Sequence, residues 1–330
     1  MISRIASLQD TALAATVLSK VPLYYTEGAD ASLDRPEHVR AGSSLAWFGN
    51  RIAVIQDDAH FVALIDPKDG QVDALPLPVG EGGLRQFDDL RANKRFKLDL
   101  EACLTLSSPD GEVLLAFGSG SNKHRETVVR VSASGAIDLA QASGLYHRFR
   151  TTKAFSGSEL NIEGAAFIDG WVRFFNRGNG ESREGLLPLD ATCDVLWNEL
   201  EAYLRDPENL NVPELHRIIQ YDLGTLNSIR LTFTDATATD RGMLYVASAE
   251  NSPDAITDGS VTGSVIGVLD ERMGCRWTEL RDADGGPFSA KIEGVCAARN
   301  LEGLVYVVTD ADDPARPSEL LEVALAGPWA

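Results

Sequence analysis

The stretch Asn161–Asn176 reads NIEGAAFIDGWVRFFN and contains the pattern that decides the fold. An apolar run follows Glu163, and the dipeptide Asp169-Gly170 separates it from a second apolar run at Trp171–Phe175. An Asp-Gly turn between two apolar runs is typical of a β-hairpin. The stretch therefore predicts two antiparallel strands, the second of which ends at a polar cluster that begins with Asn176.

The same pattern recurs along the whole chain. Each copy opens with an acidic or hydroxyl residue, continues apolar, turns, and enters a strongly apolar strand. The opening residues are separated by 57, 62, 72 and 58 residues. A repeated unit of antiparallel strands at such spacings is typical of a β-propeller. The opening residues of the copies are Ser44, Glu101, Glu163, Asp235 and Glu293.

Further apolar segments predict the outer strands of each unit. A third strand is expected in every copy and a fourth in most of them. In the third copy we place the third strand at Leu186–Leu189 and the fourth at His216–Leu223. The segment between them has apolar residues at helical spacing before Asp206-Pro207, so we expect an inserted helix at about 193–205.

These repeats predict an all-β fold, a five-bladed β-propeller in one domain that spans residues 1–330. The last copy has only three strands, and an N-terminal strand at residues 15–23 is expected to complete it and to close the ring. Closure of this kind removes exposed sheet edges. The alternative is a six-bladed propeller with a further blade within residues 190–230.

The composition excludes some classes of function. The chain has 30 basic and 49 acidic side chains, a net charge of −19, so a nucleic-acid or anionic-membrane binder is not expected. No apolar run approaches the length of a membrane span. Gln9 and Asp10 interrupt the stretch that would form the core of a signal peptide, and the four cysteines lie far apart. We therefore expect a cytoplasmic, monomeric protein.

The opening residues are expected to converge on the propeller axis, because the first strand of each blade lines the central channel. Converging carboxylates repel unless a cation compensates them. A ring of oxygen ligands without Cys or His favours Ca²⁺ over Zn²⁺. The expected metal ligands are Ser44, Glu101, Glu163, Asp235 and Glu293. Alternatively, the same side chains bind backbone N–H groups of neighbouring blades and only fasten the ring.

A second group of polar residues follows the second strand of each copy. These loops are expected at the channel mouth, close to the ring, where functional residues of a scaffold gather. We expect the cationic members to meet an anionic substrate and the polar members to complete its binding site. The expected substrate-binding residues are Lys123, His124, Arg177, Asn176, Asn251 and Asp310.

The chain resembles the calcium-dependent apyrases, a family of five-bladed propellers that hydrolyse nucleoside di- and triphosphates, and the phytase-like bacterial propellers. The resemblance lies in Ser43-Ser44-Leu45-Ala46-Trp47-Phe48, in Asn161–Phe167 and in Lys291–Val295. It implies a central calcium held in the order Ser44 (or Ser43), Glu101, Glu163, Asp235 (or Thr234), Glu293. The loop Lys123–Thr127 lacks the tryptophan of the apyrase loop, and Arg177 stands without a second arginine.

Three functions remain open from the sequence. The first is a calcium-dependent hydrolase of a phosphorylated or other anionic small molecule, with Glu163 or Asp57 as general base. The second is a non-catalytic propeller that binds a ligand or a protein partner on its loop face. The third is a lactonase-type hydrolase.

Overall fold

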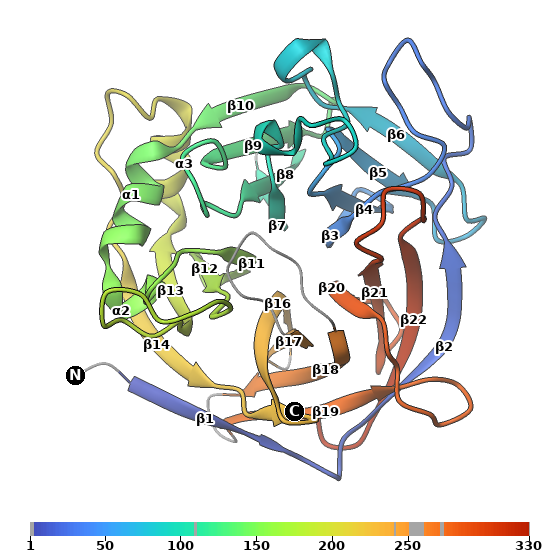
Figure 1. The fold of residues 1–330 in the computed structure, drawn as a ribbon, viewed down its shortest axis with the longest axis vertical. Coiled ribbons are helices and arrows are strands. Elements are labelled where there is room, and N and C mark those ends of the chain that lie inside the picture. Colours follow the sequence, from blue (N-terminus) through green and yellow to red (C-terminus); the bar gives the residue numbers. More distant parts are fainter. Residues whose placement is uncertain (1–2, 109–110, 241, 251–260, 271–273, 330) are drawn as a thin grey trace.

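The computed structural model describes residues 3–108, 111–240, 242–250, 261–270 and 274–329. Nearly all regular elements are strands, which confirms the all-β prediction. The strands form four-stranded antiparallel sets that stand around a central axis, as the blades of a β-propeller do (Figure 1). Each set, called a ladder below, presents its first strand to the axis and its fourth strand to the outside.

The ladders follow one another along the chain, with the four strands of each in sequence order. The first ladder consists of β3 (Gly42–Phe48), β4 (Arg51–Gln56), β5 (Phe61–Ile65) and β6 (Val72–Pro76). The second consists of β7 (Leu100–Ser108), β8 (Gly111–Gly118), β9 (Thr127–Ser132) and β10 (Ile137–Gln141). The third consists of β11 (Ile162–Ile168), β12 (Trp171–Asn176), β13 (Asp190–Leu196) and β14 (His216–Asp222).

The last two ladders differ in how they begin and end. The fourth consists of β16 (Ile229–Thr239), β17 (Gly242–Glu250), β18 (Val261–Asp270) and β19 (Gly274–Arg281), and the two-residue strand β15 (Thr225–Leu226) pairs with β16. The fifth consists of β20 (Lys291–Ala297), β21 (Leu304–Asp310) and β22 (Glu319–Ala326), and then of β2 (Ala14–Pro22), which runs antiparallel to β22. The outermost strand of this ladder therefore comes from the other end of the chain.

The strand β1 (Ser3–Gln9) was not expected from the sequence. It pairs in parallel with β14 through Ser3–Ala6 and with β19 through Ser7–Gln9. Together with a short parallel contact between β2 and β19, it joins the third, fourth and fifth ladders into one mixed sheet of 14 strands. Most side chains of β1 are exposed, so the apolar alternation that reveals other strands is absent.

The third strand of the third ladder lies later in the chain than predicted. It is β13, Asp190–Leu196, and not Leu186–Leu189. The inserted helix α3 begins at Trp197 and ends at Arg205, so residues 193–196 of the expected helix belong to a strand. Because β13 is covered on both faces, its residues are buried almost without interruption. Such a run cannot be told from a buried helical turn by periodicity alone.

The other helices are short. α1 (Ser143–Thr151) and α2 (Lys153–Ser156) connect the second and third ladders, and two 3₁₀ turns, Glu81–Gly83 and Lys94–Phe96, lie in the connection between the first two ladders. None of the helices in the described residues is long and apolar enough to cross a membrane.

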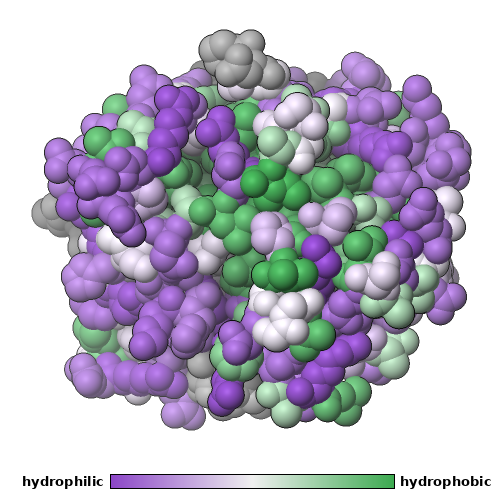
Figure 2. Space-filling view, turned by 90° about the horizontal axis from the view of Figure 1, so that it is seen from above, coloured by the Kyte–Doolittle hydropathy of each residue, from purple (hydrophilic) through white to green (hydrophobic). Residues whose placement is uncertain are grey.

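The core lies between adjacent ladders. Phe117 of the second ladder meets Phe174 of the third edge to face, with 5.0 Å between ring centroids. Near the axis the inner strands approach so closely that a Cβ atom on Gly294 would lie 2.9 Å from the Cα atom of Ser44. Figure 2 looks onto the side of the molecule at the top of Figure 1 and shows apolar side chains gathered near its middle within a largely polar surface.

Candidate functional site

Every inner strand contains a β-bulge, which lies near the start of β3, β7, β11 and β20 and in the middle of β16. The pairing with the second strand skips one residue between Gly42 and Ser44, Leu100 and Ala102, Ile162 and Gly164, Phe233 and Asp235, and Ile292 and Gly294. A bulge leaves the extra residue unpaired and changes the direction of its side chain. The equivalent residues of the ladders are therefore Ser43, Glu101, Glu163, Thr234 and Glu293.

This register places two of the expected ring residues one position beyond the bulge. Ser44 and Asp235 are buried and bonded to each other: the Ser44 hydroxyl donates to the Asp235 carboxylate at 3.1 Å. The backbone N–H of Val295 donates to the same carboxylate oxygen at 2.9 Å, and the N–H of Cys103 donates to the Ser44 hydroxyl at 3.2 Å. Ser44 and Asp235 thus link four inner strands, β3, β7, β16 and β20, across the axis.

The three glutamates at bulges lie in the same buried space. Burial is the main cause that raises the pKa of Glu163 to about 8 and that of Glu293 to about 7. Burial, with the charges of Asp99 and Glu163 added, holds the pKa of Glu101 well above its usual range. The charge of Glu163 adds to the raised pKa of Glu101, and the charge of Glu293 adds to that of Glu163.

Each of these glutamates has a different set of partners. Glu163 accepts hydrogen bonds from the Asn161 amide at 2.6 Å and from Arg177 at 3.3 Å. One oxygen of Glu293 lies 2.6 Å from the Lys291 ammonium group, whereas its Oε2 is buried and has no hydrogen-bond partner among the described residues. A buried carboxylate oxygen without a partner is costly, and it points to a ligand or to a bound proton.

Further carboxylates surround the glutamates at the mouth. Lys97 lies between Asp57, at 2.5 Å, and Asp99, at 2.7 Å, and Arg125 contacts Asp99 at 2.8 Å. Asp57, Asp99 and Glu101 bring one carboxylate oxygen each within 4.8 Å of one another, a spacing that allows a shared metal ion.

On the other side of the mouth, two basic residues connect three ladders. Arg177 contacts Glu250 at 2.6 Å in addition to Glu163. Lys291 lies 3.5 Å from Glu250 and 3.6 Å from Asp312. Burial and the charges of Asp312 and Asp57 hold the pKa of Asp310 well above its usual range. Charge interactions therefore connect the carboxylates on this side of the mouth with Asp57 on the other side.

We call this assembly the mouth cluster. Among the described residues it contains eight acidic and four basic side chains, so its carboxylates outnumber its basic groups by four. The acidic members are Asp57, Asp99, Glu101, Glu163, Glu250, Glu293, Asp310 and Asp312, and the basic members are Lys97, Arg125, Arg177 and Lys291.

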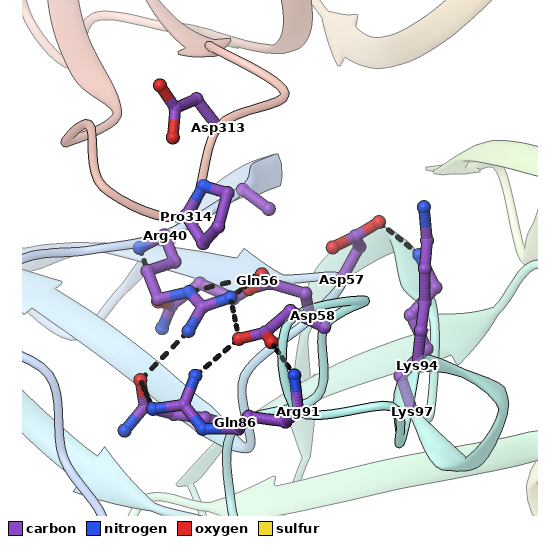
Figure 3. Close-up of polar contacts among 12 residues, drawn as sticks. Arg40, Gln56, Asp57, Asp58, Gln86, Arg91, Lys94, Lys97, Asp313 and Pro314 are labelled. Carbon is purple, nitrogen blue, oxygen red and sulfur yellow. Dashed lines mark hydrogen bonds and ion pairs between the residues drawn. The ribbon is translucent and has the colours of Figure 1, made fainter. Parts of the chain in front are cut away.

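A cavity of about 360 Å³ opens beside the mouth cluster, between the first ladder and the loop that precedes β22. Asp57, Asp310 and Lys97 line it, together with Asp58 and Pro314. Figure 3 shows Asp57 and Asp58 on one wall and Asp313 and Pro314 on the facing loop. A molecule in this cavity would therefore touch the mouth cluster.

A buried arginine fixes the wall of this cavity. Arg40 forms an ion pair with Asp58, lies 3.0 Å from Asp88, and donates to the Gln86 side-chain carbonyl at 2.9 Å (Figure 3). Burial and the nearby charge of Asp57 raise the pKa of Asp58 to about 6. The network attaches the connection between the first two ladders to β4 and gives the cavity a fixed shape.

The predicted substrate-binding residues lie in different surroundings. Lys123 and His124 are exposed at the loop surface, and Asp310 lines the cavity. Arg177 is buried and already paired. Asn176 is fully buried, accepts from the backbone N–H of Asn161 at 2.8 Å and donates to the Leu189 carbonyl at 2.8 Å, so it holds its own loop. Asn251 lies outside the described residues.

Sequence reasoning missed three basic members of the cluster, Lys97, Arg125 and Lys291. A signal for Lys291 was present: it precedes Glu293 by two positions, and residues two apart on a strand share a face. Asn161 precedes Glu163 and Asp99 precedes Glu101 in the same way. Lys97 and Arg125 lie in irregular segments, where no periodicity applies.

The fold and this site define a β-propeller with an acidic channel mouth. A family model described as "Family of unknown function (DUF6929)" matches residues 38–325, so the chain belongs to this family. No curated protein sequence matches the chain.

Several solved structures are similar in fold. A glycosyl hydrolase from Bacteroides ovatus is 13% identical, with 94% of each chain covered and a TM-score of 0.40. The PQQ-bound aldose sugar dehydrogenase of Streptomyces coelicolor is 11% identical over 95% of this chain and 98% of that chain, with a TM-score of 0.42. The Pan2 WD40 domain of Neurospora crassa is 9% identical over 98% of each chain, with a TM-score of 0.36. Likeness at this level says nothing about activity.

Proposed function

We propose that this protein is a five-bladed propeller, with β2 closing the ring, whose mouth cluster binds a divalent cation, Ca²⁺, and hydrolyses a small anionic molecule such as a phosphate ester. Each ladder is then one blade. The observation that carries the proposal is the surplus of buried carboxylates over basic partners at the mouth. A cation bound there would neutralise charges that otherwise force protons onto the glutamates.

The residues present fit such an ion. The orphaned Oε2 of Glu293 is an oxygen donor without a competing partner. Glu101, Glu163 and Glu293, with the bulge hydroxyls of Ser43 and Thr234, offer only hard oxygen ligands, which suit Ca²⁺ and do not suit Zn²⁺. We choose the alternative residues of the expected order, Ser43 and Thr234, because they occupy the same bulge position as Glu101, Glu163 and Glu293, whereas Ser44 and Asp235 lie one residue beyond it.

Two carboxylates compete for the role of general base, and we assign it to Asp57. Asp57 borders the cavity and is held by Lys97 at 2.5 Å, so its carboxylate would be positioned next to a bound molecule. Glu163 is turned toward Asn161 and Arg177 inside the ring. A bound divalent cation would supply Lewis acidity toward a substrate oxygen.

In this proposal only the exposed basic side chains at the rim of the mouth contact the substrate. Arg177, Lys97 and Lys291 are buried and paired with carboxylates. Lys123 and His124 are exposed and available to an anion that enters the mouth. We therefore propose that they guide and position the substrate while the mouth cluster carries out the chemistry.

One observation favours the lactonase-type alternative. Asn161 donates to Glu163 at 2.6 Å and lies 3.5 Å from the Asn179 side-chain oxygen, so amides stand beside the acids at the mouth. Mixed amide and carboxylate donors also suit a metal-dependent hydrolysis of a lactone.

The test combines binding and turnover in one variant. The double substitution Glu163→Gln with Glu293→Gln is expected to abolish calcium binding in titration calorimetry and to abolish calcium-dependent turnover of phosphate esters, nucleotides or lactones. Glu112→Gln, at the far end of β8, is the matched control and should change neither. Unchanged turnover in the double variant would rule out the mechanism. Absence of turnover in the wild type, with tight binding of a protein partner, would favour the non-catalytic alternative.

A further inference from the structure

The outer strand of the second ladder, β10, has a free edge. The backbone N–H of Ala142 donates to the Glu126 carbonyl at 2.9 Å, directly beyond the last pair of the register between β9 and β10. Bonded and non-bonded pairs alternate in an antiparallel ladder, so the even-numbered residues of β10 bond to β9. The N–H and C=O groups of Leu139 and Gln141 therefore face outward, and no backbone hydrogen bond to them occurs among the described residues.

The outer strands of the other ladders are covered by the chain itself. β1 pairs with β14 and β19, and β2, the outer strand of the fifth ladder, pairs with β19 through Ala15 and Thr16. On β6 the N–H and C=O groups of Val72 bond to the side chain and the backbone of Thr26, at 2.9 Å each, and Pro76 offers no N–H. Within the described part of the chain, β10 is thus the outer strand without any such cover. A bare edge is a template for pairing with another chain.

A groove of about 510 Å³ opens beside this edge, between the second ladder and α3. Four consecutive residues of β10, Asp138–Gln141, line the groove, so it reaches the backbone of the strand and not only one face. Leu115 and Val128 of the ladder are buried in its apolar wall, and Trp197 and Leu204 of α3 line the groove as well. β10 lies near the top of Figure 1, and Figure 2, which looks onto that side, shows apolar side chains near its middle.

A free edge beside an apolar groove suits an extended peptide, which bonds to the edge through its backbone and places alternate side chains in the groove. β1 already binds in this way within the molecule, since it pairs in parallel with four residues of β14 and with three of β19. β10 offers an edge of similar length, five residues from Ile137 to Gln141.

The charges around the groove indicate which residues such a peptide carries. Four carboxylates and two arginines line the groove, so basic side chains are favoured at the ends of the apolar stretch. The carboxylates are Asp138, Glu201, Asp206 and Glu208, and the arginines are Arg130 and Arg205. We propose that β10 and this groove bind an extended segment of a partner protein by β-strand addition, with apolar residues at alternate positions and basic residues on either side of them.

The test uses the labelled peptide Lys-Thr-Ile-Thr-Ile-Thr-Lys, with blocked ends, on the full chain at about 0.15 M salt, where long-range attraction between exposed charges is screened. Fluorescence anisotropy should show saturable binding, and hydrogen exchange should slow at Leu139 and Gln141 in the complex. A peptide with the same side chains and every backbone nitrogen methylated should bind about tenfold more weakly or worse, because backbone hydrogen bonds supply the affinity in strand addition. The isomer with adjacent isoleucines should also bind more weakly.

Two variants and a matched control test the surface itself. Leu139→Pro removes one outward N–H group, at a position where an edge strand tolerates proline, and should weaken binding by about tenfold. Ala74→Pro is the control: Ala74 lies two residues from Val72 on the edge of β6, and its substitution should leave binding unchanged. Ala140→Phe fills the groove without changing the edge and should also weaken binding.

Three results would overturn the proposal. The first is the absence of saturable binding of the peptide to the wild type. The second is equal binding of the methylated peptide, which would mean that charge alone attracts the peptide. The third is binding by Ala140→Phe as tight as that of the wild type, a result that remains decisive if Leu139→Pro fails to fold.

Discussion

Charged side chains are paired in opposite ways at the two ends of the third ladder. At the mouth, Arg177 contacts two carboxylates, Glu163 and Glu250, and the surrounding cluster has more acids than bases. At the other end, Arg173 and Arg217 both contact one carboxylate, Asp194. Arg173 and Arg177 are only four residues apart on and after β12, so a single strand supplies both arrangements.

This difference shows that the acidic composition of the whole chain does not predict the balance of charges at a particular site. A net charge of −19 predicts a preference for cations everywhere on the surface. The structure concentrates surplus acid at the mouth, where a cation would relieve it, and joins two arginines to one buried carboxylate at the opposite end of the third ladder. The predictions below test each end against the other.

The largest effect is expected from Asp194→Ala. This change removes a fully buried carboxylate that contacts Arg173, whose side chain is 14% exposed. Loss of one member of a buried pair leaves an uncompensated charge and costs about 3–5 kcal/mol. Urea denaturation should show this loss in the free energy of unfolding. A loss below about 1 kcal/mol would mean that solvent reaches Arg173 and that the end opposite to the mouth is not a buried site.

Calcium removal at the mouth should have the next largest effect. An ion that binds only the folded state stabilises it by about 2.7 kcal/mol at a hundredfold excess over Kd. For a chain of this length, that corresponds to a change in Tm of about 4 °C. EDTA should lower Tm by this amount at pH 7.5 and by less near pH 5, where protonated carboxyls bind metal poorly. If neither calcium nor EDTA moves Tm, the glutamates act only as fasteners.

The metal-free protein should lose stability as the pH rises. The pKa values of Glu163 and Glu293 are raised to about 8 and about 7, so the folded state binds more protons than the unfolded state above pH 4.5. Their stabilisation is fully present below pH 4.5 and is lost as the pH rises through 7 and 8. Between pH 6.5 and 8.5 the loss should be about 3 kcal/mol.

This pH window also separates the glutamates from a buried histidine. Burial lowers the pKa of His60 to about 4, so its contribution is present above pH 6.5 and is lost as the pH falls from 6.5 toward 4. Above pH 6.5 the histidine should therefore contribute no slope. Denaturant melts of the Glu163→Gln, Glu293→Gln double variant should show a flatter dependence there; an equally steep one would assign the slope to other groups.

The smallest effect on stability is expected from Arg217→Gln. Arg217 is about half-exposed, and Asp194 keeps both contacts to Arg173, so the free energy of unfolding should fall by less than about 1 kcal/mol. The measurement compares this small loss of stability with the larger loss expected for Asp194→Ala. Equal losses in the two variants would show that Arg217 is as important for the structure as Asp194 is.

Much of the fold followed from local pattern. The hairpin at Asn161–Asn176 shows why: its turn chemistry and its apolar runs are local, and no distant residue is needed to specify them. The N-terminal strand was expected at residues 15–23 and lies at Ala14–Pro22. Where an element has little apolar pattern, as in β1, or is buried on both faces, as in β13, the sequence did not reveal its type or its bounds.

The candidate site, too, was predicted in part from local pattern and in part not. The amino-acid sequence by itself determined that Glu101, Glu163 and Glu293 occur at equivalent positions of a repeat, because repeat spacing is a property of the chain. Only the tertiary structure decided that Ser43 and Thr234, and not Ser44 and Asp235, share that position, because each bulge inserts one residue into a period of two and exchanges the faces of the strand. Only the tertiary structure brought Lys97, Arg125 and Lys291 to those acids and Arg217 to Asp194, since electrostatic pairing depends on distances across ladders that no local pattern encodes.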